Sequence, residues 1–185
     1  MRLVLVSRWA GGPRSDWYPW LAEVASGRFS EVLVPKMPRP ERAEIAAWKQ
    51  TLTELLAPGD KLEDTVFLGH SVGCQAILRW LAEQEPGRRA AGFVGVAAWW
   101  KVVDPWQSLL PWLEHDYPIE RARAAVGSAA VLISDNDQYT PDHAENAALW
   151  RDRLGAEVVL QPAAGHFNDK VQPGVLELLL RRFGV

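Results

Sequence analysis

The sequence has little cysteine, no excess of charge of one sign and no long apolar run. Cys74 is the single cysteine, so an internal disulfide is excluded. The 20 Lys and Arg and 23 Asp and Glu residues give a net charge of −3 without a basic block, which argues against a nucleic-acid partner. No apolar stretch approaches the roughly 20 residues that cross a bilayer, and the first strand-like run is too short for a signal-peptide core. We therefore expect a cytoplasmic protein without a membrane partner.

Six short apolar runs alternate with six helical patterns. Continuous apolar runs are typical of strands buried on both faces, and the alternation indicates βαβ units. We predict an α/β fold with one domain over residues 1–185, in which a mostly parallel six-stranded sheet lies between two helical layers. The expected strands are 3–6, 31–34, 65–68, 93–97, 129–133 and 157–160. The expected helices are 16–25, 41–56, 72–85, 119–126, 142–154 and 173–183.

Helix-capping and helix-breaking residues give the expected ends of the helices. Ser15 is a suitable N-cap for the first helix. Pro58-Gly59 is expected to end the second helix, and Gly155 the fifth.

The most informative motif is Gly69-x-Ser71-x-Gly73, between an expected strand and an expected helix. In that context the pattern indicates a nucleophile elbow, a turn so tight that only glycine fits two residues to either side of the serine. The turn would hold the Ser71 hydroxyl at the edge of the sheet, above the positive end of the next helix. The alternative is a serine that caps an ordinary helix.

A catalytic serine needs partners that also follow strands, because ligands bind at the carboxyl ends of parallel strands. Asp135 and Asp137 follow the fifth expected strand, and His166 follows the sixth. Serine, acid and histidine in this order is the chain order of α/β-hydrolases. Imidazole can take the serine proton near neutrality, and a carboxylate on its other nitrogen holds the correct tautomer.

His166 is the histidine that follows a strand, with Gly165 allowing close approach. His70 is expected to pack beneath the elbow, on the opposite side of the turn from Ser71. His115 and His143 are expected to be exposed.

Two aspartates compete for the role of the acid. Asp137 is preferred because it lies four residues before Pro141, a spacing found at strand ends in many α/β-hydrolases. Asp135 would instead buttress the loop, and Asp104 is a more distant candidate.

A metal or cofactor is not expected. The cluster of Asp135, Asn136, Asp137 and Asp142 lacks the glycine and glutamate of a calcium-binding loop. The sequence also has no Cys/His cluster with zinc spacing.

Further motifs lie along nearly the whole chain: Asp16-Trp17-x-x-Trp20-Leu21, Met37-Pro38-x-Pro40, Trp48, Gly69-His70-Ser71-x-Gly73, Ser134-x-x-Asp137-x-x-x-Pro141 and Gly165-His166-Phe167. In these motifs the chain resembles the small α/β serine hydrolases that include the animal retinoblastoma-binding serine hydrolase and the bacterial YdeN-like proteins. The resemblance implies a compact hydrolase fold with a minimal cap, a Ser71–Asp137–His166 triad and weak carboxylesterase activity on artificial esters.

One segment departs from the common hydrolase pattern. Where many α/β-hydrolases have His-Gly after the first strand, this chain has Ser7-Arg8. The backbone amides of Trp9 and Val72 are then the expected oxyanion donors. Arg8 restricts the backbone more than glycine does, and a loop that cannot turn its N–H toward the oxyanion loses one donor. Low activity is therefore expected, unless Gly11-Gly12 lets the loop present a donor in another conformation.

The 10 tryptophans cluster partly after the fourth expected strand, at Trp99, Trp100, Trp106 and Trp112. They fit either an aromatic lid that favours an apolar or aromatic substrate, or a small core or dimer contact. For Arg8, a solvated side chain is preferred over a partner for a substrate carboxylate.

Together these patterns predict a serine hydrolase, a monomer or homodimer without a cofactor. It would cleave a carboxylic ester, or a related acyl bond, of a small apolar or aromatic substrate through an acyl-enzyme. The alternative is a non-catalytic binding protein on the same scaffold that uses its tryptophan-rich rim.

Overall fold

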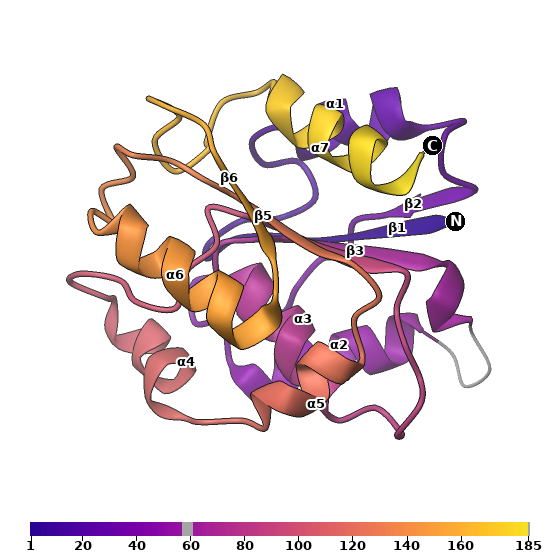
Figure 1. The fold of residues 1–185 in the computed structure, drawn as a ribbon, viewed down its shortest axis with the longest axis horizontal. Helices are drawn as coiled ribbons and strands as arrows, with labels where there is room; N and C mark the ends of the chain where they lie inside the picture. Colours follow the sequence, from indigo (N-terminus) through magenta and orange to yellow (C-terminus); the bar gives the residue numbers. More distant parts are fainter. Residues whose placement is uncertain (57–60, 185) are drawn as a thin grey trace.

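The computed structural model describes residues 1–56 and 61–184 and contains one sheet of six strands (Figure 1). The strand order is β2-β1-β3-β4-β5-β6, and all five neighbouring pairs are parallel. The predicted α/β class and three-layer arrangement are therefore confirmed. The strands are β1 (Arg2–Val6), β2 (Glu31–Leu33), β3 (Thr65–His70), β4 (Gly92–Val96), β5 (Ala129–Ile133) and β6 (Glu157–Leu160).

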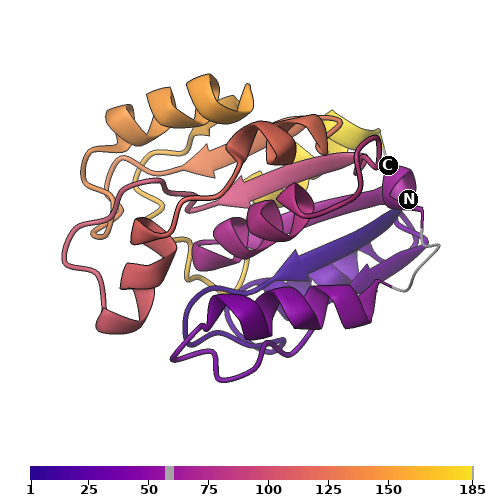
Figure 2. The same ribbon diagram turned by 90° about the horizontal axis from the view of Figure 1, so that it is seen from below.

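Helices cover both faces of the sheet. The layer at the top of Figure 1 holds α1 (Tyr18–Ala25) and α7 (Pro173–Phe183). Figure 2 shows the opposite layer in front of the sheet. This layer consists of α2 (Ile45–Leu55), α3 (Val72–Ala82), α5 (Ile119–Ala124) and α6 (His143–Leu154). A short helix, α4 (Leu110–Glu114), and two 3-10 turns, Leu62–Asp64 and Gln107–Leu109, complete the elements of the described residues.

The strands pack apolar side chains on both faces, as their continuous apolar runs predicted. In β1, Leu3 and Leu5 face the cluster that includes α1 and α7, whereas Val4 and Val6 face the cluster that includes α2 and α3. All four side chains are fully buried. β3 and β4 are buried along their whole length, so the centre of the sheet is the best-shielded part of the molecule.

Two helices begin later than predicted because residues before them have positive φ. Asp16 has φ of 48°, so α1 starts after Trp17, and Ser15 is not its N-cap. The Ser15 hydroxyl instead accepts a hydrogen bond from the N–H of Gly12. Ala43 has φ of 44°, which keeps residues 41–44 out of α2.

The predicted end of α6 at Gly155 is confirmed. Gly155 ends α6 with φ of 66°, in the left-handed region that glycine tolerates. The predicted stop at Pro58-Gly59 lies outside the described residues. Helix α4 was not predicted, because a five-residue helix leaves almost no periodic signal.

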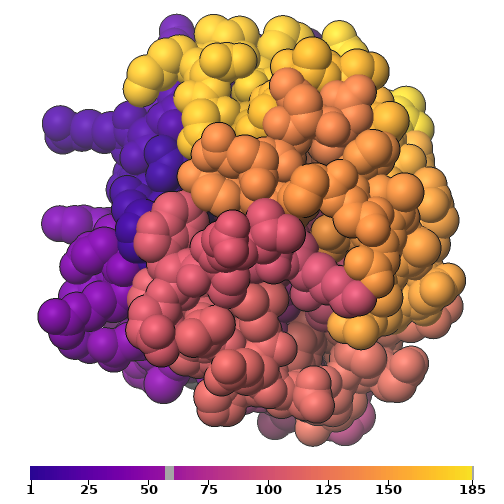
Figure 3. Space-filling model, turned by 90° about the vertical axis from the view of Figure 1, so that its left-hand side faces the viewer, coloured from indigo at the N-terminus to yellow at the C-terminus, as the bar shows by residue number. Residues whose placement is uncertain are grey.

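Figure 3 views the molecule from the carboxyl ends of the strands. The loop after β1 (indigo), the tryptophan-rich segment after β4 (rose) and the loops after β5 and β6 (orange to yellow) meet on this side. None of the helices in the described residues is both long enough and apolar enough to span a membrane.

Candidate active site

Ser71 occupies a strained turn between β3 and α3. Its backbone has φ of 54° and ψ of −121°, a conformation that non-glycine residues rarely adopt. The flanking glycines have no room for a side chain: a Cβ on Gly69 would lie 2.6 Å from the backbone of Cys74, and one on Gly73 would lie 2.3 Å from the carbonyl oxygen of Val6. The sequence motif therefore forms the tight strand-to-helix turn that its glycines predicted.

His166 and Asp137 form a hydrogen-bonded pair after β6 and β5. His166 Nδ1 lies 2.7 Å from Asp137 Oδ2, and both side chains are at least nine-tenths buried. The other carboxylate oxygen, Oδ1, accepts the N–H of Tyr139 at 3.0 Å. Because a carboxylate only accepts hydrogen bonds, the Nδ1 atom carries a proton, and in the neutral ring Nε2 is the acceptor.

Three consecutive side chains after β5 hold the loop that carries His166. Asp135 Oδ1 accepts the N–H of Ala163 at 2.8 Å. Ser134 Oγ accepts the N–H of Ala164 at 3.0 Å, and Asn136 Oδ1 accepts the N–H of Gly165 at 2.7 Å. Asp135 thus buttresses the loop, as predicted for the aspartate that does not contact His166. Gly165 has open space around its α-carbon and φ of 56°, so it is required for its backbone conformation rather than for close approach.

His70 fixes the backbone of His166 from beneath the elbow. It is fully buried, and its Nε2 lies 2.9 Å from the carbonyl oxygen of His166. A carbonyl only accepts, so Nε2 carries the proton and Nδ1 accepts from the hydroxyl of Tyr18 at 2.7 Å. Burial, together with the nearby His166, lowers the pKa of His70 well below 6.5, so the ring is neutral. The predicted position of His70 on the far side of the turn is confirmed.

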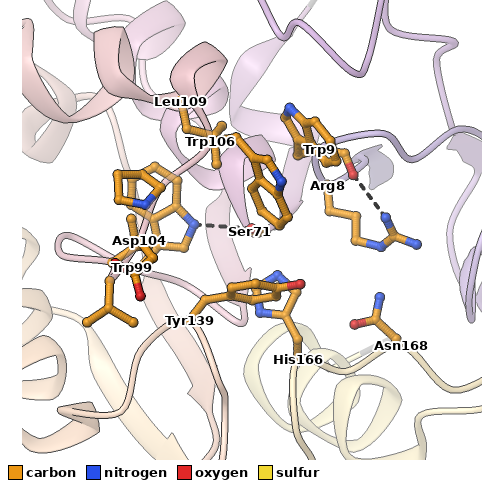
Figure 4. A pocket seen from close by; sticks show the side chains of 13 residues that line it. Arg8, Trp9, Ser71, Trp99, Asp104, Trp106, Leu109, Tyr139, His166 and Asn168 are labelled. Carbon is orange, nitrogen blue, oxygen red and sulfur yellow. Dashed lines mark hydrogen bonds between the residues drawn. The ribbon is translucent and has the colours of Figure 1, made fainter.

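Ser71 Oγ accepts a hydrogen bond from an indole. The Nε1–H of Trp99 donates to Ser71 Oγ at 3.1 Å (Figure 4). Among the hydrogen bonds of the described residues, none joins Ser71 to His166, although both side chains line one cavity. Catalytic hydrogen bonds are often long without substrate and tighten when the substrate binds.

The cavity over Ser71 has a volume of about 140 Å³, and its walls are mostly apolar, with several aromatic rings among them. Trp9 and Trp106 stack with ring centroids 4.4 Å apart and planes 6° apart. Trp106 also packs against Tyr139, which meets the His166 ring edge-on at 4.8 Å. Figure 4 shows Trp9 and Trp106 on one side of Ser71, with Tyr139 and His166 on the other. The lining residues are Arg8, Trp9, Ser71, Trp99, Val102, Val103, Asp104, Pro105, Trp106, Leu109, Tyr139, His166 and Asn168.

Arg8 is not the solvated side chain that was predicted. Its Nε and Nη2 atoms donate to the two carboxylate oxygens of Asp16 at 2.8 and 3.1 Å. Nη1 donates to the carbonyl oxygen of Trp9 at 2.9 Å. Burial alone would lower the pKa of Arg8, but the hydrogen bond and charge of Asp16 outweigh it and raise that pKa. Because the charge is already paired, Arg8 organises the loop after β1 rather than offering a site for a substrate carboxylate.

The predicted substrate residues separate into two groups. Trp9 and Trp99 line the cavity over Ser71. Trp100 does not: its ring packs against Trp150 with centroids 4.8 Å apart, outside the lining of this cavity. The two residues therefore face different parts of the molecule: Trp99 donates to Ser71, whereas Trp100 packs against α6.

The two expected oxyanion donors lie in suitable elements. Val72 is the first residue of α3, where backbone N–H groups have no partner within the helix. The loop after β1 places Trp9 beside Ser71 in the same cavity, and the N–H of Arg8 is already bonded to the hydroxyl of Tyr18 at 3.1 Å. The Trp9 amide is therefore the next N–H along this loop.

No group of three or more His, Cys, Asp or Glu side chains within residues 1–56 and 61–184 is arranged to hold a metal ion. His115 is exposed as predicted, whereas His143 is only half-exposed. Asp104 lines the cavity but does not contact His166 in the way that Asp137 does.

A family model described as serine hydrolase matches residues 3–183. The chain belongs to the serine hydrolase family. This serine hydrolase is 25% identical over 142 residues to YdeN of Bacillus subtilis (strain 168), covering 76% of this chain and 73% of YdeN. The predicted resemblance to the YdeN-like proteins is therefore confirmed.

Solved structures agree on the fold of this serine hydrolase. The structure of the ydeN gene product of B. subtilis matches with a TM-score of 0.88 at 21% identity, over 100% of this chain and 99% of the other. Est1E from Butyrivibrio proteoclasticus matches with a TM-score of 0.71 at 12% identity, over 100% of this chain and 88% of the other. The likeness shows that the chain has the α/β-hydrolase fold.

Sequence reasoning missed the groups that hold the site together. Trp17 donates its indole N–H to the carbonyl oxygen of Phe167 at 2.9 Å, which links α1 to the loop after β6. Tyr18 acts on the same loop through His70. The motif residues of the resemblance were a signal for these links, but sequence spacing alone does not pair residues 150 positions apart.

Proposed function

We propose that this serine hydrolase cleaves carboxylic esters with Ser71 as nucleophile, His166 as general base and Asp137 as the acid that orients the histidine. The observation that carries the proposal is the 2.7 Å bond between His166 and Asp137, in a cavity wall shared with a serine on a strained turn. Two buried side chains in that arrangement leave the His166 Nε2 lone pair available for the proton of Ser71.

The chemistry then follows in two halves. The Ser71 hydroxyl proton passes to His166 Nε2 while Oγ bonds to the ester carbonyl carbon, and the carbonyl electrons move onto its oxygen. The N–H groups of Val72 and Trp9 stabilise this oxyanion. Its collapse expels the alcohol, which takes the proton from His166, and leaves an acyl-enzyme. Water repeats the sequence on the acyl-enzyme and releases the carboxylic acid together with the serine hydroxyl.

The hydrogen bond from Trp99 to Ser71 Oγ assists both the formation and the hydrolysis of the acyl-enzyme. An N–H that donates to Oγ leaves the serine proton free to point toward His166. The same N–H stabilises the oxygen whenever it carries negative charge, as it does during attack and again when Oγ leaves the acyl-enzyme.

The cavity indicates the size of the substrate. A volume of about 140 Å³ is close to the cavities of ~150 Å³ that hold benzene in other proteins. Rings of tryptophan and tyrosine together with Val, Pro and Leu side chains make a mostly apolar wall, so an apolar group is favoured. We infer that the bound group is a short acyl chain or a single aromatic ring.

Labelling with a fluorophosphonate probe tests the nucleophile, because the probe reacts with an activated serine. We expect the wild type to be labelled, the Ser71→Ala variant to stay unlabelled, and the Ser26→Ala variant, changed at an exposed serine, to react like the wild type. Hydrolysis of nitrophenyl acetate, butyrate and decanoate would then test the size limit, with decanoate the slowest. A folded wild type that is neither labelled nor able to hydrolyse these esters would support a binding protein instead.

A further inference from the structure

The cavity over Ser71 has an accessible carboxylate in its wall. Its lining includes one guanidinium, that of Arg8, and one carboxylate, that of Asp104. Arg8 donates to both carboxylate oxygens of Asp16, whereas Asp104 is exposed and joins none of the ion pairs within residues 1–56 and 61–184. Lys101, three residues earlier, is paired with a glutamate and does not line the cavity. The Asp104 carboxylate is therefore free to attract a cation that enters from solvent.

Aromatic rings line the same space. Trp106 follows Asp104 by two residues and is 41% exposed, so solvent reaches this ring. Trp9 stacks on Trp106 with centroids 4.4 Å apart, and the Tyr139 ring lies 5.2 Å from that of Trp106. Figure 4 shows Asp104 and Trp99 on the same side of Ser71. Because the faces of such rings carry negative partial charge, they attract organic cations.

The carboxylate lies on the leaving-group side of the site. In the proposed reaction His166 gives its proton to the departing alcohol, so the alcohol leaves past the His166 ring. Tyr139 meets that ring edge-on at 4.8 Å, and the Tyr139 carbonyl oxygen accepts the N–H of Val103 at 2.9 Å. The segment that carries Asp104 is thereby bonded to the residue that borders His166. This arrangement puts the alcohol part of an ester, rather than the acyl part, on the side of Asp104.

We propose that the site selects esters whose alcohol carries a quaternary ammonium group, as choline does, and that Asp104 sets this preference. The substrate class rests on the proposed esterase activity of Ser71. A trimethylammonium group is compact, has an apolar surface and needs no hydrogen-bond acceptor, which suits a mostly apolar wall with one carboxylate. A primary ammonium would lose hydrogen bonds to water that such a wall does not replace.

The reaction of a choline ester follows the proposed mechanism without a further reactant. Ser71 Oγ bonds to the acetyl carbon of acetylcholine while its proton passes to His166. The bond to the choline oxygen then breaks, and choline leaves with that proton. Water attacks the acetyl-enzyme, and the products are choline, acetate and one proton.

Two esters of nearly equal shape separate charge from size. Acetylcholine carries the cation, and dimethylbutyl acetate, in which carbon replaces the nitrogen, is neutral. Acid release in a pH-stat gives kcat/KM for each ester. We expect the wild type to prefer acetylcholine about tenfold, from cation–π contacts together with attraction to an exposed carboxylate. Equal or lower kcat/KM for acetylcholine would overturn the substrate class and leave the esterase activity in place.

Asp104→Asn tests the residue itself. The variant should fold, because asparagine tolerates a φ of 46° as aspartate does. The ratio of kcat/KM between the two esters should fall from about ten to about three. Added sodium chloride should lower this ratio in the wild type, because salt screens an exposed charge, and should affect the variant less.

Asp152→Asn is the matched control, because Asp152 is an exposed aspartate outside the cavity. It should keep the ratio of the wild type. A wild-type ratio in Asp104→Asn would remove the proposed role from Asp104.

Binding of the alcohols alone distinguishes this proposal from the esterase activity. Choline and dimethylbutanol are titrated into ¹⁵N-labelled protein and followed at the Trp106 indole peak, which is assigned by its loss in Trp106→Phe. Choline should shift this peak saturably and bind about tenfold more tightly than the neutral alcohol, whereas the Trp17 indole, bonded to Phe167, should not move.

The two sets of results separate the two proposals. Choline binding without hydrolysis of either ester would support the cation site and contradict the esterase activity. Equal affinity for the two alcohols, or no saturable shift with choline, would overturn the cation site.

Discussion

The indole N–H of Trp99 donates a hydrogen bond to the hydroxyl oxygen of Ser71. Gln75 holds the backbone of Trp99 in place. Its Nε2 donates to the Trp99 carbonyl oxygen at 2.6 Å, and its Oε1 accepts from Arg79. Helix α3, which carries Ser71 at its N-terminus, thus also holds the residue that donates to that serine.

We expect Trp99→Phe to lower kcat about tenfold while KM changes little. The substitution removes the donor and keeps an aromatic ring, so the lost interaction is one that strengthens as Oγ becomes charged. Steady-state kinetics on a nitrophenyl ester would measure both parameters. Trp106→Phe, which alters the cavity wall without touching Ser71, should change KM instead. A normal kcat in Trp99→Phe would remove this role from the indole.

Of the two aspartates after β5, Asp137 should lower kcat far more than Asp135 when it is replaced by asparagine. Asp137→Asn is expected to lower kcat about a thousandfold or more, because an amide at this position favours the wrong tautomer of His166. Asp135→Asn should keep most of the activity and lower thermal stability slightly, since Asp135 supports only a backbone N–H. Kinetics and melting curves of both variants test the assignment. The opposite pattern would make Asp135 the acid.

Much of the fold could be predicted because its signals are local. The strands at 129–133 and 157–160 and the helix at 173–183 have the bounds that the sequence predicted. The start of α1 was predicted too early because Asp16 leaves helical geometry to pair with Arg8, which belongs to another element. Propensity within a segment contains no information about such a partner.

His70 should make stability depend on pH below about 6.5. Its pKa in the folded protein is lowered, so as pH falls through the unfolded value near 6.5 the unfolded chain binds a proton that the folded chain does not. The free energy of unfolding should therefore fall by about 1 kcal/mol per pH unit below that point, and this contribution should be constant above it. Urea unfolding at several pH values measures the slope.

The matched variants for this slope are His70→Asn and His115→Asn. The first should flatten the dependence below about pH 6.5, whereas the second, at an exposed histidine, should leave it as in the wild type. An unchanged slope in His70→Asn would show that the ring is protonated when folded.

Gly73→Ala should destabilise the protein by about 3 kcal/mol or more, because the added Cβ would lie 2.3 Å from the carbonyl oxygen of Val6 and 2.8 Å from that of Ser7. Chemical denaturation compares it with Gly12→Ala, whose Cβ would have nothing within 4 Å. We expect the second variant to match the wild type. A stable Gly73→Ala protein would mean that β1 and α3 can separate at the elbow.

The site was predicted less completely than the fold. Ser71, Asp137 and His166 could be named because each follows a strand, and all carboxyl ends of a parallel sheet meet at one edge. Trp99 and Trp100 could not be told apart, because identical neighbours after one strand give no signal of which side each faces. The support of His166 by Ser134 and Asn136 was also hidden, since it joins side chains to backbone groups about thirty residues away.

Ser71 and His166, the proposed nucleophile and base, follow strands that differ in how well they are shielded. Ser71 follows β3, which lies inside the sheet and is wholly buried, whereas His166 follows β6, an edge strand that leaves Leu160 45% exposed. Edges loosen before centres when a protein is warmed. Mild heating should therefore abolish activity reversibly, by displacing His166, the proposed proton acceptor, while the middle strands are still intact.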